Sequence, residues 1–228
     1  MFEMECLPML KKGKKMKTSN NGNLVGQMHK LIPENQIGDF KIVHHIATLE
    51  DVKFYKLRSA LHNDYGGYGY HDFEIGTYTE LKHNGGVISS DTPMEIRTCQ
   101  DAVENASGNV LIAGLGLGIV LLEIQARSSV KSIIVIEKSR EVMDLVDKYL
   151  PLTKAITIVK NDIFKWLPNK NTKFDTIYFD IWDDICGDNY KEMKELHKKF
   201  RKFKNKDAWM GSWSYDFCKK KYHEEEER

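Results

Sequence analysis

From residue 110 onwards, short continuous apolar runs alternate with stretches in which apolar residues recur at helical spacing. We interpret the apolar runs as buried strands at 110–113, 133–137, 156–159, 174–180 and 208–213. Helices are expected between them at 119–127, from the cap Ser139 to Pro151, at 164–167 before Pro168, and at 189–204. Buried strands separated by helices indicate a parallel sheet covered on both faces. The pattern therefore predicts a doubly wound α/β domain over residues 99–218.

A different pattern precedes this domain. Short runs of aromatic and β-branched residues at 40–43, 73–79 and 86–90 are broken by glycine and asparagine. Asn84-Gly85 stands between the last two runs and is a strong hairpin signal. We expect a small antiparallel β domain over residues 37–98.

The two ends of the chain are polar. Five lysines between Lys11 and Lys17 are followed by a Ser/Asn/Gly stretch without a packing period. Residues 1–36 are therefore expected to form a flexible basic arm, and residues 219–228 a charged tail.

Charge and composition narrow the function. With 34 Lys+Arg against 33 Asp+Glu, the net charge of +1 gives no field that would favour a nucleic-acid partner. The longest uncharged apolar run, from Val110 to Leu122, is too short to span a bilayer. The first residues lack the pattern of a signal peptide, so we expect a cytoplasmic protein with no membrane partner. The four cysteines lie far apart and are expected to be reduced, and histidines such as His44 and His45 have no third ligand at a defined spacing, so no metal is expected.

A glycine-rich turn follows the first strand of the α/β domain. Gly114, Gly116 and Gly118 let the backbone approach a ligand while the following helix offers free N–H groups. Glu137 ends the next strand, where its carboxylate can accept both hydroxyl hydrogens of a ribose. Ile119 stands where the dinucleotide fingerprint G-x-G-x-x-G has its third glycine. The turn therefore favours a nucleoside ligand that lacks a pyrophosphate.

Acids also follow the third and fourth strands. Asp162 and Ile163 come after the third strand, where a carboxylate and an apolar neighbour could recognise adenine. Asp180 and Asp183 come after the fourth strand. Because open α/β sheets hold ligands at the carboxyl ends of their strands, we expect these acids to share one site. The alternative for each single acid is that it only caps the following helix.

Three segments match the motifs of one family. Residues 110–123 keep the frame of V-L-I-I-G-G-G-D-G-G-x-x-x-E, residues 148–151 match K-Y-F/L-P, and residues 174–184 keep both acids of Y-D-x-I-x-x-D-S-S-D-P. The chain thereby resembles the class I S-adenosylmethionine-dependent methyltransferases, and within them the spermidine synthase-like (aminopropyltransferase) branch. Leu115 and Leu117 depart from the motif by replacing a glycine and an aspartate. The resemblance implies a C-terminally shortened member with a Rossmann-like fold.

The resemblance also implies a cofactor, S-adenosylmethionine or its decarboxylated form, and roles for the residues above. The glycines would lie alongside the aliphatic chain of the cofactor. Glu137 and Lys138 would contact its ribose, and Asp162 and Ile163 would contact its adenine. Asp180 would face the sulfonium and take a proton from the acceptor, with Asp183 nearby. The implied residues are Gly114, Gly116, Gly118, Glu137, Lys138, Asp162, Ile163, Asp180 and Asp183.

Three functions stay open at this point. Methyl transfer to a small-molecule acceptor is narrowly favoured. The first alternative is aminopropyl transfer from decarboxylated S-adenosylmethionine. The second is a non-catalytic module that binds a nucleoside or a partner. A homodimer is compatible with all three.

Overall fold

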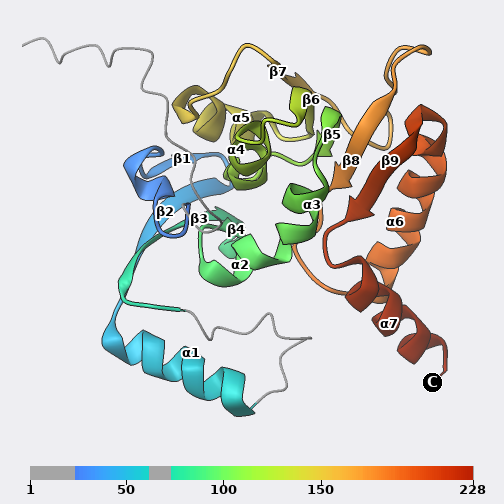
Figure 1. The fold of residues 1–228 in the computed structure, drawn as a ribbon. Coiled ribbons are helices and arrows are strands. Elements are labelled where there is room, and N and C mark those ends of the chain that lie inside the picture. Colours follow the sequence, from blue (N-terminus) through green and yellow to red (C-terminus); the bar gives the residue numbers. More distant parts are fainter. Residues whose placement is uncertain (1–23, 62–72, 228) are drawn as a thin grey trace, which may run out of the picture.

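The computed structural model describes residues 24–61 and 73–227, which contain a parallel and an antiparallel sheet (Figure 1). The parallel sheet has five strands in the order β7-β6-β5-β8-β9. The strands are β5 (Gly108–Ala113), β6 (Val130–Glu137), β7 (Ile156–Lys160), β8 (Phe174–Phe179) and β9 (Lys204–Ser212). The helices between them are α4 (Ile119–Gln125), α5 (Arg140–Val146) with the 3-10 turn η3 (Asp147–Tyr149), and α6 (Gly187–Phe200) with η4 (Arg201–Phe203). This order confirms the predicted doubly wound α/β fold.

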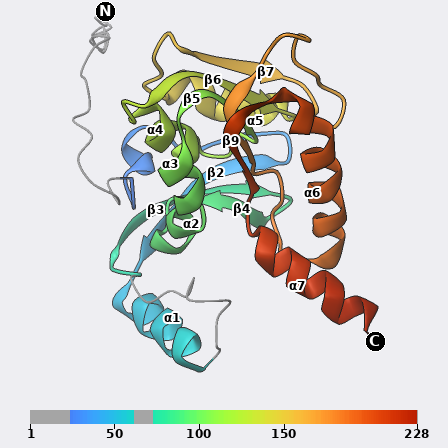
Figure 2. The same cartoon turned by 45° about the vertical axis from the view of Figure 1, so that its right-hand side comes forward.

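The two faces of the parallel sheet carry separate hydrophobic cores because successive strand residues point to opposite sides. Val110 and Ile112 of β5 pack with α4 and α5 in one core. Leu111 and Ala113 of the same strand pack with α6 in the other core. Figure 2 shows α6 on one side of the sheet, with α4 away from it. The apolar run at 110–113 is therefore buried on both faces of the sheet, as its sequence predicts.

The small sheet is antiparallel in the order β1-β2-β3-β4. Its strands are β1 (Asn35–Ile37), β2 (Phe40–Ala47), β3 (Gly76–His83) and β4 (Gly86–Ser90). At the predicted hairpin, Asn84 and Gly85 both adopt positive φ, 49° and 85°, as the tight turn requires. The helix α1 (Leu49–Leu61) follows β2, and α2 (Pro93–Thr98) and α3 (Gln100–Asn105) lead from β4 into β5.

The predicted arm over residues 1–36 is wrong for its described part. Residues 1–23 lie outside the described residues. Residues 24–36 are described; they contain the 3-10 helix η1 (Met28–Lys30), and Leu24, Met28 and Ile32 are buried in the core. Asp91 holds this segment in place. Its carboxylate accepts hydrogen bonds from the backbone N–H of Met28, at 2.8 Å, and of Thr79 on β3, at 2.6 Å.

Two further expectations need correction. Residues 163–165 form a turn and residues 166–168 have no regular structure, so the helix expected at 164–167 is absent. Pro168 has no N–H to donate to the carbonyl of Phe164, and the ammonium of Lys199 donates to the carbonyls of Ile163 and Phe164 instead. The predicted tail from residue 219 continues the helix α7 (Tyr215–Glu226). This helix is ordered by packing on α6, where Tyr190 contacts Tyr222 with ring centroids 5.4 Å apart. In the parts of the chain that the structure describes, no helix is both long enough and apolar enough to cross a membrane.

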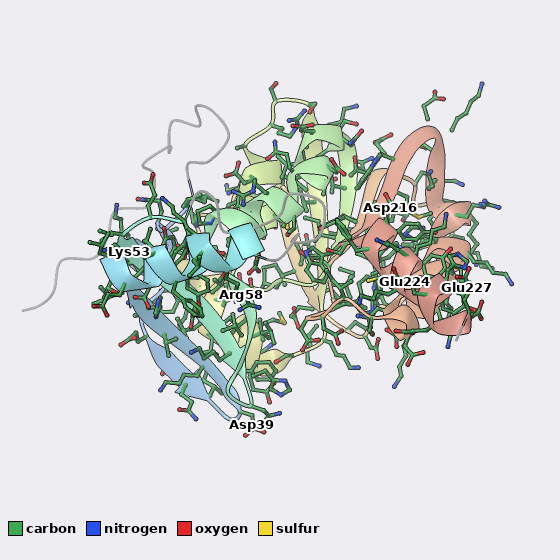
Figure 3. All side chains as sticks on the ribbon, turned by 90° about the horizontal axis from the view of Figure 1, so that it is seen from below. Asp39, Lys53, Arg58, Asp216, Glu224 and Glu227 are labelled. Atoms are coloured by element: carbon green, nitrogen blue, oxygen red, sulfur yellow. The ribbon has the colours of Figure 1, made fainter. Side chains whose placement is uncertain are left out.

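We predict that Asp91→Ala lowers the free energy of unfolding by about 2–4 kcal/mol, because two buried N–H groups lose their acceptor. Urea unfolding followed by circular dichroism measures the change. Asp39→Ala is the matched control, since Asp39 is exposed at the edge of the molecule (Figure 3). Equal stability of the two variants would contradict the anchoring role of Asp91.

Candidate functional site

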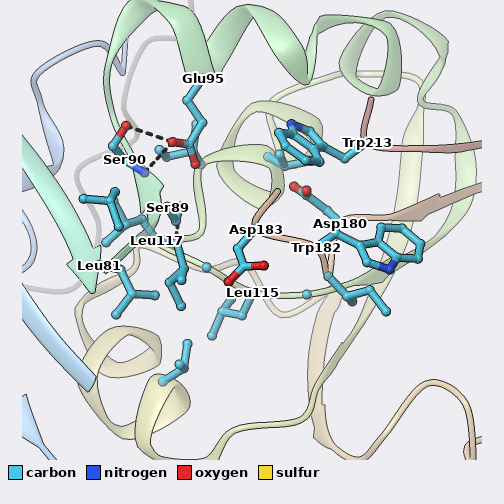
Figure 4. A pocket seen from close by; sticks show the side chains of 18 of the residues that line it. Leu81, Ser89, Ser90, Glu95, Leu115, Leu117, Asp180, Trp182, Asp183 and Trp213 are labelled. Atoms are coloured by element: carbon cyan, nitrogen blue, oxygen red, sulfur yellow. Dashed lines mark hydrogen bonds between the residues drawn. The ribbon is translucent and has the colours of Figure 1, made fainter. Parts of the chain in front are cut away.

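A cavity of about 1300 Å³ lies between the two sheets, at the carboxyl ends of the central parallel strands (Figure 4). The glycine turn, the ends of β6 and β8, and the β4–α2 segment form its walls. Most residues predicted to hold a ligand line it, namely Gly114, Gly116, Glu137, Lys138, Asp162, Ile163, Asp180 and Asp183. Gly118 is absent from the described lining and packs instead against Leu150, whose Cδ1 would lie 2.4 Å from a Cβ at residue 118.

The glycine turn is shaped by the protein's own backbone. Gly114 has φ +97°, and a Cβ there would lie 1.9 Å from the carbonyl oxygen of Asp180. The N–H of Asp180 in turn bonds the carbonyl of Ala113 at 2.8 Å. Gly116, with φ +50°, approaches Ser89 of β4. Glycine at these positions therefore lets the ends of β5 and β8 and the small sheet meet at the cavity.

Glu137 presents a fixed carboxylate to the cavity. Its Oε2 accepts the N–H of Leu115 at 2.8 Å, and its Oε1 accepts the N–H of Ser139 at 2.6 Å. The residue is only 8% exposed. Each carboxylate oxygen keeps capacity for a further hydrogen bond. The geometry therefore fits a ligand that offers two neighbouring hydroxyl groups, such as a ribose.

Asp162 lies next to this carboxylate site. Its Oδ1 accepts the N–H of Phe164 at 3.0 Å, and its Oδ2 lies 3.4 Å from Nζ of Lys138. Desolvation acts to raise the pKa of Asp162, but the Phe164 N–H and the Lys138 charge together outweigh it and hold the pKa below its usual value. Asp162 therefore stays ionised as an acceptor, and buried Ile163 supplies an apolar wall beside it.

The opposite end of the cavity collects acids from separate elements. Asp180 follows β8, exposed Asp183 lies on the same loop, and Glu95 comes from α2 (Figure 4). Burial, and next the charge of Glu95, raise the pKa of Asp180 to about 7. The thiol of Cys99 lies 3.9 Å from Oδ2 of Asp180 and partly offsets this rise. Asp180 therefore changes its charge near neutral pH.

The sequence analysis does not identify several residues of this end. Glu95 is held by Ser90, whose N–H and hydroxyl donate to its Oε2 at 2.7 and 2.8 Å. Trp213 donates its Nε1–H to Thr98 at 2.9 Å and forms another wall. The only sequence signal for Glu95 is that residues 86–95 partly keep D-E-x-x-Y-x-E, a pattern that precedes the α/β domain in the family that the chain resembles. Within residues 24–61 and 73–227, no three histidines, cysteines or acids gather as metal ligands.

Comparisons with known proteins find similarity over the same region. The sequence model of the spermine/spermidine synthase domain matches residues 96–212, just over half of the chain. A polyamine aminopropyltransferase of Clostridium beijerinckii is 26% identical over an alignment that covers 50% of this chain and 57% of the relative. The chain thus spans little more than half of the length of that relative.

Two solved structures are also similar. A spermidine synthase from Thermotoga maritima gives a TM-score of 0.49 at 17% identity, covering 67% of this chain and 57% of that chain. A spermidine synthase in complex with the transition-state analogue AdoDATO gives 0.49 at 16% identity, with the same two coverages.

We predict that Asp180→Asn stabilises the fold at alkaline pH. Because the folded-state pKa of about 7 lies above the ordinary 3.8, ionising Asp180 costs folding free energy. The cost is absent below pH 4 and complete above pH 7. Asparagine should therefore raise the free energy of unfolding by about 1–3 kcal/mol at pH 8, with the gain shrinking towards pH 4.

Urea unfolding at both pH values measures this effect, and Asp183→Asn on the exposed part of the same loop is the control. A gain that did not depend on pH would show that Asp180 carries no ionisation cost.

Proposed function

The chain belongs to the spermine/spermidine synthase domain family, and on this basis we propose that it transfers the aminopropyl group of decarboxylated S-adenosylmethionine to an amine. The family match includes all five parallel strands and the acids that follow them. The curated relative, an aminopropyltransferase, supports the same choice. Both favour aminopropyl transfer over the methyl transfer that the sequence analysis narrowly prefers.

The distribution of charge in the cavity is the observation that carries this proposal. Glu95, Asp180 and Asp183 line the end opposite Glu137 and Asp162. Among the lining residues that the structure describes, one lysine and one arginine carry positive charge. The lysine is Lys138, which forms an ion pair with Asp162, and the arginine is Arg58 on α1. The acidic end therefore suits an ammonium and disfavours the carboxylate of intact S-adenosylmethionine. A decarboxylated donor and a cationic amine acceptor fit this pattern best.

Asp180 is proposed as the base. An amine that enters as an ammonium has no lone pair and must lose a proton before it can attack carbon. A carboxylate with a pKa near 7 can take that proton at neutral pH. A bound sulfonium donor supplies the electrophilic carbon and a thioether leaving group. Exposed Asp183 is proposed to attract the acceptor cation, while Glu137 holds the donor's ribose.

The test compares donors directly. The protein is incubated with decarboxylated or intact S-adenosylmethionine and a series of linear diamines, and the release of methylthioadenosine or S-adenosylhomocysteine is measured. We expect methylthioadenosine with the decarboxylated donor. Asp180→Asn should keep donor affinity, measured by calorimetry, and lose turnover by about 10²–10⁴-fold. Release of S-adenosylhomocysteine instead would assign methyl transfer, and binding without turnover would assign a non-catalytic module.

A second prediction concerns pH. The rate at low substrate should rise with pH up to about 7 and then level, because Asp180 acts as a base only when ionised. Glu95→Gln removes a charge that raises the pKa of Asp180 and should move this rise to lower pH. The control is Glu195→Gln on the exposed side of α6. An unmoved profile in Glu95→Gln would exclude coupling between Glu95 and Asp180.

A further inference from the structure

The segment after β7, residues 161–166, carries Asp162 and Ile163 to the cavity, and we call it the β7 loop. Its first half is held by the backbone. The N–H of Asn161 donates to the carbonyl of Glu137 at 2.9 Å, and the carbonyl of Asp162 accepts the N–H of Lys165 at 2.9 Å. These bonds fix the side of the loop that lies next to the carboxylate of Glu137.

A lysine on α6 holds the second half of the β7 loop. Nζ of Lys199 donates to the carbonyl oxygens of Ile163 and Phe164, at 2.9 and 2.6 Å. The next residue, Phe200, is fully buried and stacks on Trp166 with ring centroids 6.3 Å apart. The helix α6 therefore contacts the loop through two charge-assisted hydrogen bonds and through an aromatic stack.

Lys199 acts on the cavity from behind the β7 loop. Asp162, Ile163 and Phe164 line the cavity, whereas Lys199 is absent from the described lining. The N–H of Phe164 donates to Oδ1 of Asp162 at 3.0 Å, so the residue that Lys199 holds in turn orients the carboxylate of Asp162. Burial lowers the pKa of Lys199, and the charge of Asp162 acts in the opposite direction. A partly desolvated ammonium forms stronger hydrogen bonds than one surrounded by water.

We propose that Lys199 is a positioning residue for the adenine of the donor, because it fixes the backbone that carries Asp162 and Ile163. This role rests on the proposed function, since it requires a nucleoside donor in the cavity. A carboxylate and an apolar side chain can contact one purine together only if the backbone between them keeps one conformation. Pro168 has no N–H, so the chain offers the carbonyl of Phe164 no helical donor in place of Lys199.

Calorimetry with methylthioadenosine, the product that keeps the donor's nucleoside, tests this role. Lys199→Met removes the ammonium and keeps an unbranched side chain, and we expect it to raise the dissociation constant about tenfold. Lys199→Arg keeps a cation with several N–H donors and should recover most of the lost affinity. Lys198→Met is the matched control, because Lys198 is exposed on the same helix and should leave the affinity unchanged. Circular dichroism checks that each variant is folded.

A second nucleoside distinguishes positioning from a general loss of structure. Methylthioinosine lacks the exocyclic amino group of adenine, which Asp162 is proposed to accept as a hydrogen-bond donor. The wild type should therefore bind methylthioadenosine more tightly than methylthioinosine, and Lys199→Met should lose most of this preference. A merely less stable protein would lose affinity for both nucleosides by the same factor.

Hydrogen–deuterium exchange of the unliganded protein follows the β7 loop itself. Exchange over residues 161–166 should be faster in Lys199→Met than in the wild type and should not change in Lys198→Met. Unchanged affinity and exchange in Lys199→Met, or an equal loss of affinity for both nucleosides, would overturn the positioning role and leave the proposed function intact. A wild type that bound neither nucleoside would overturn both.

Discussion

The contact between Gly114 and the backbone of Asp180 is the constraint on which the site depends. A Cβ at residue 114 would lie 1.9 Å from the Asp180 carbonyl oxygen, so no other amino acid fits without moving a strand end. The hydrogen bond from the Asp180 N–H to Ala113 fixes the same two strands from the other side. Because β5 and β8 are adjacent and parallel, this contact brings the glycine turn and Asp180 to the same edge of the sheet.

The carboxylates of Asp91, which is buried, and Asp180, which is half-buried, have opposite roles around this edge. Asp91 accepts N–H groups from two distant segments and so stabilises the small sheet and the segment before it. Among the described contacts, the carboxylate of Asp180 accepts a hydrogen bond only from the weak S–H donor of Cys99, and burial raises its pKa to about 7. Ionised Asp180 thus lowers the free energy of unfolding. The same raised pKa gives the cavity a group that exchanges protons near neutral pH. Glu137 combines features of both residues. Like Asp91, it accepts two N–H groups, which orient its carboxylate, and like Asp180, it faces the cavity.

The small sheet contributes chemistry as well as cover. Its last strand and the following α2 supply Ser89, Ser90 and Glu95 to the cavity wall, and Glu95 acts on Asp180 through its charge. The family match begins at residue 96 and therefore leaves this wall outside it. The acidic end of the cavity is consequently built in part by residues that precede the matched region.

The sequence by itself determined the five parallel strands, the tight turn at Asn84-Gly85, the glycine turn after the first parallel strand and the acids at the ends of the next three. These features depend on local periodicity and on residues near in the chain. It did not determine the packing of residues 24–32, the helix α7 or the placement of Glu95 where its charge acts on Asp180. Met28 is ordered by Asp91 and Tyr222 by Tyr190, contacts between residues far apart in the sequence. The raised pKa of Asp180 likewise follows from burial and from a charge on another element, which only the tertiary structure brings together.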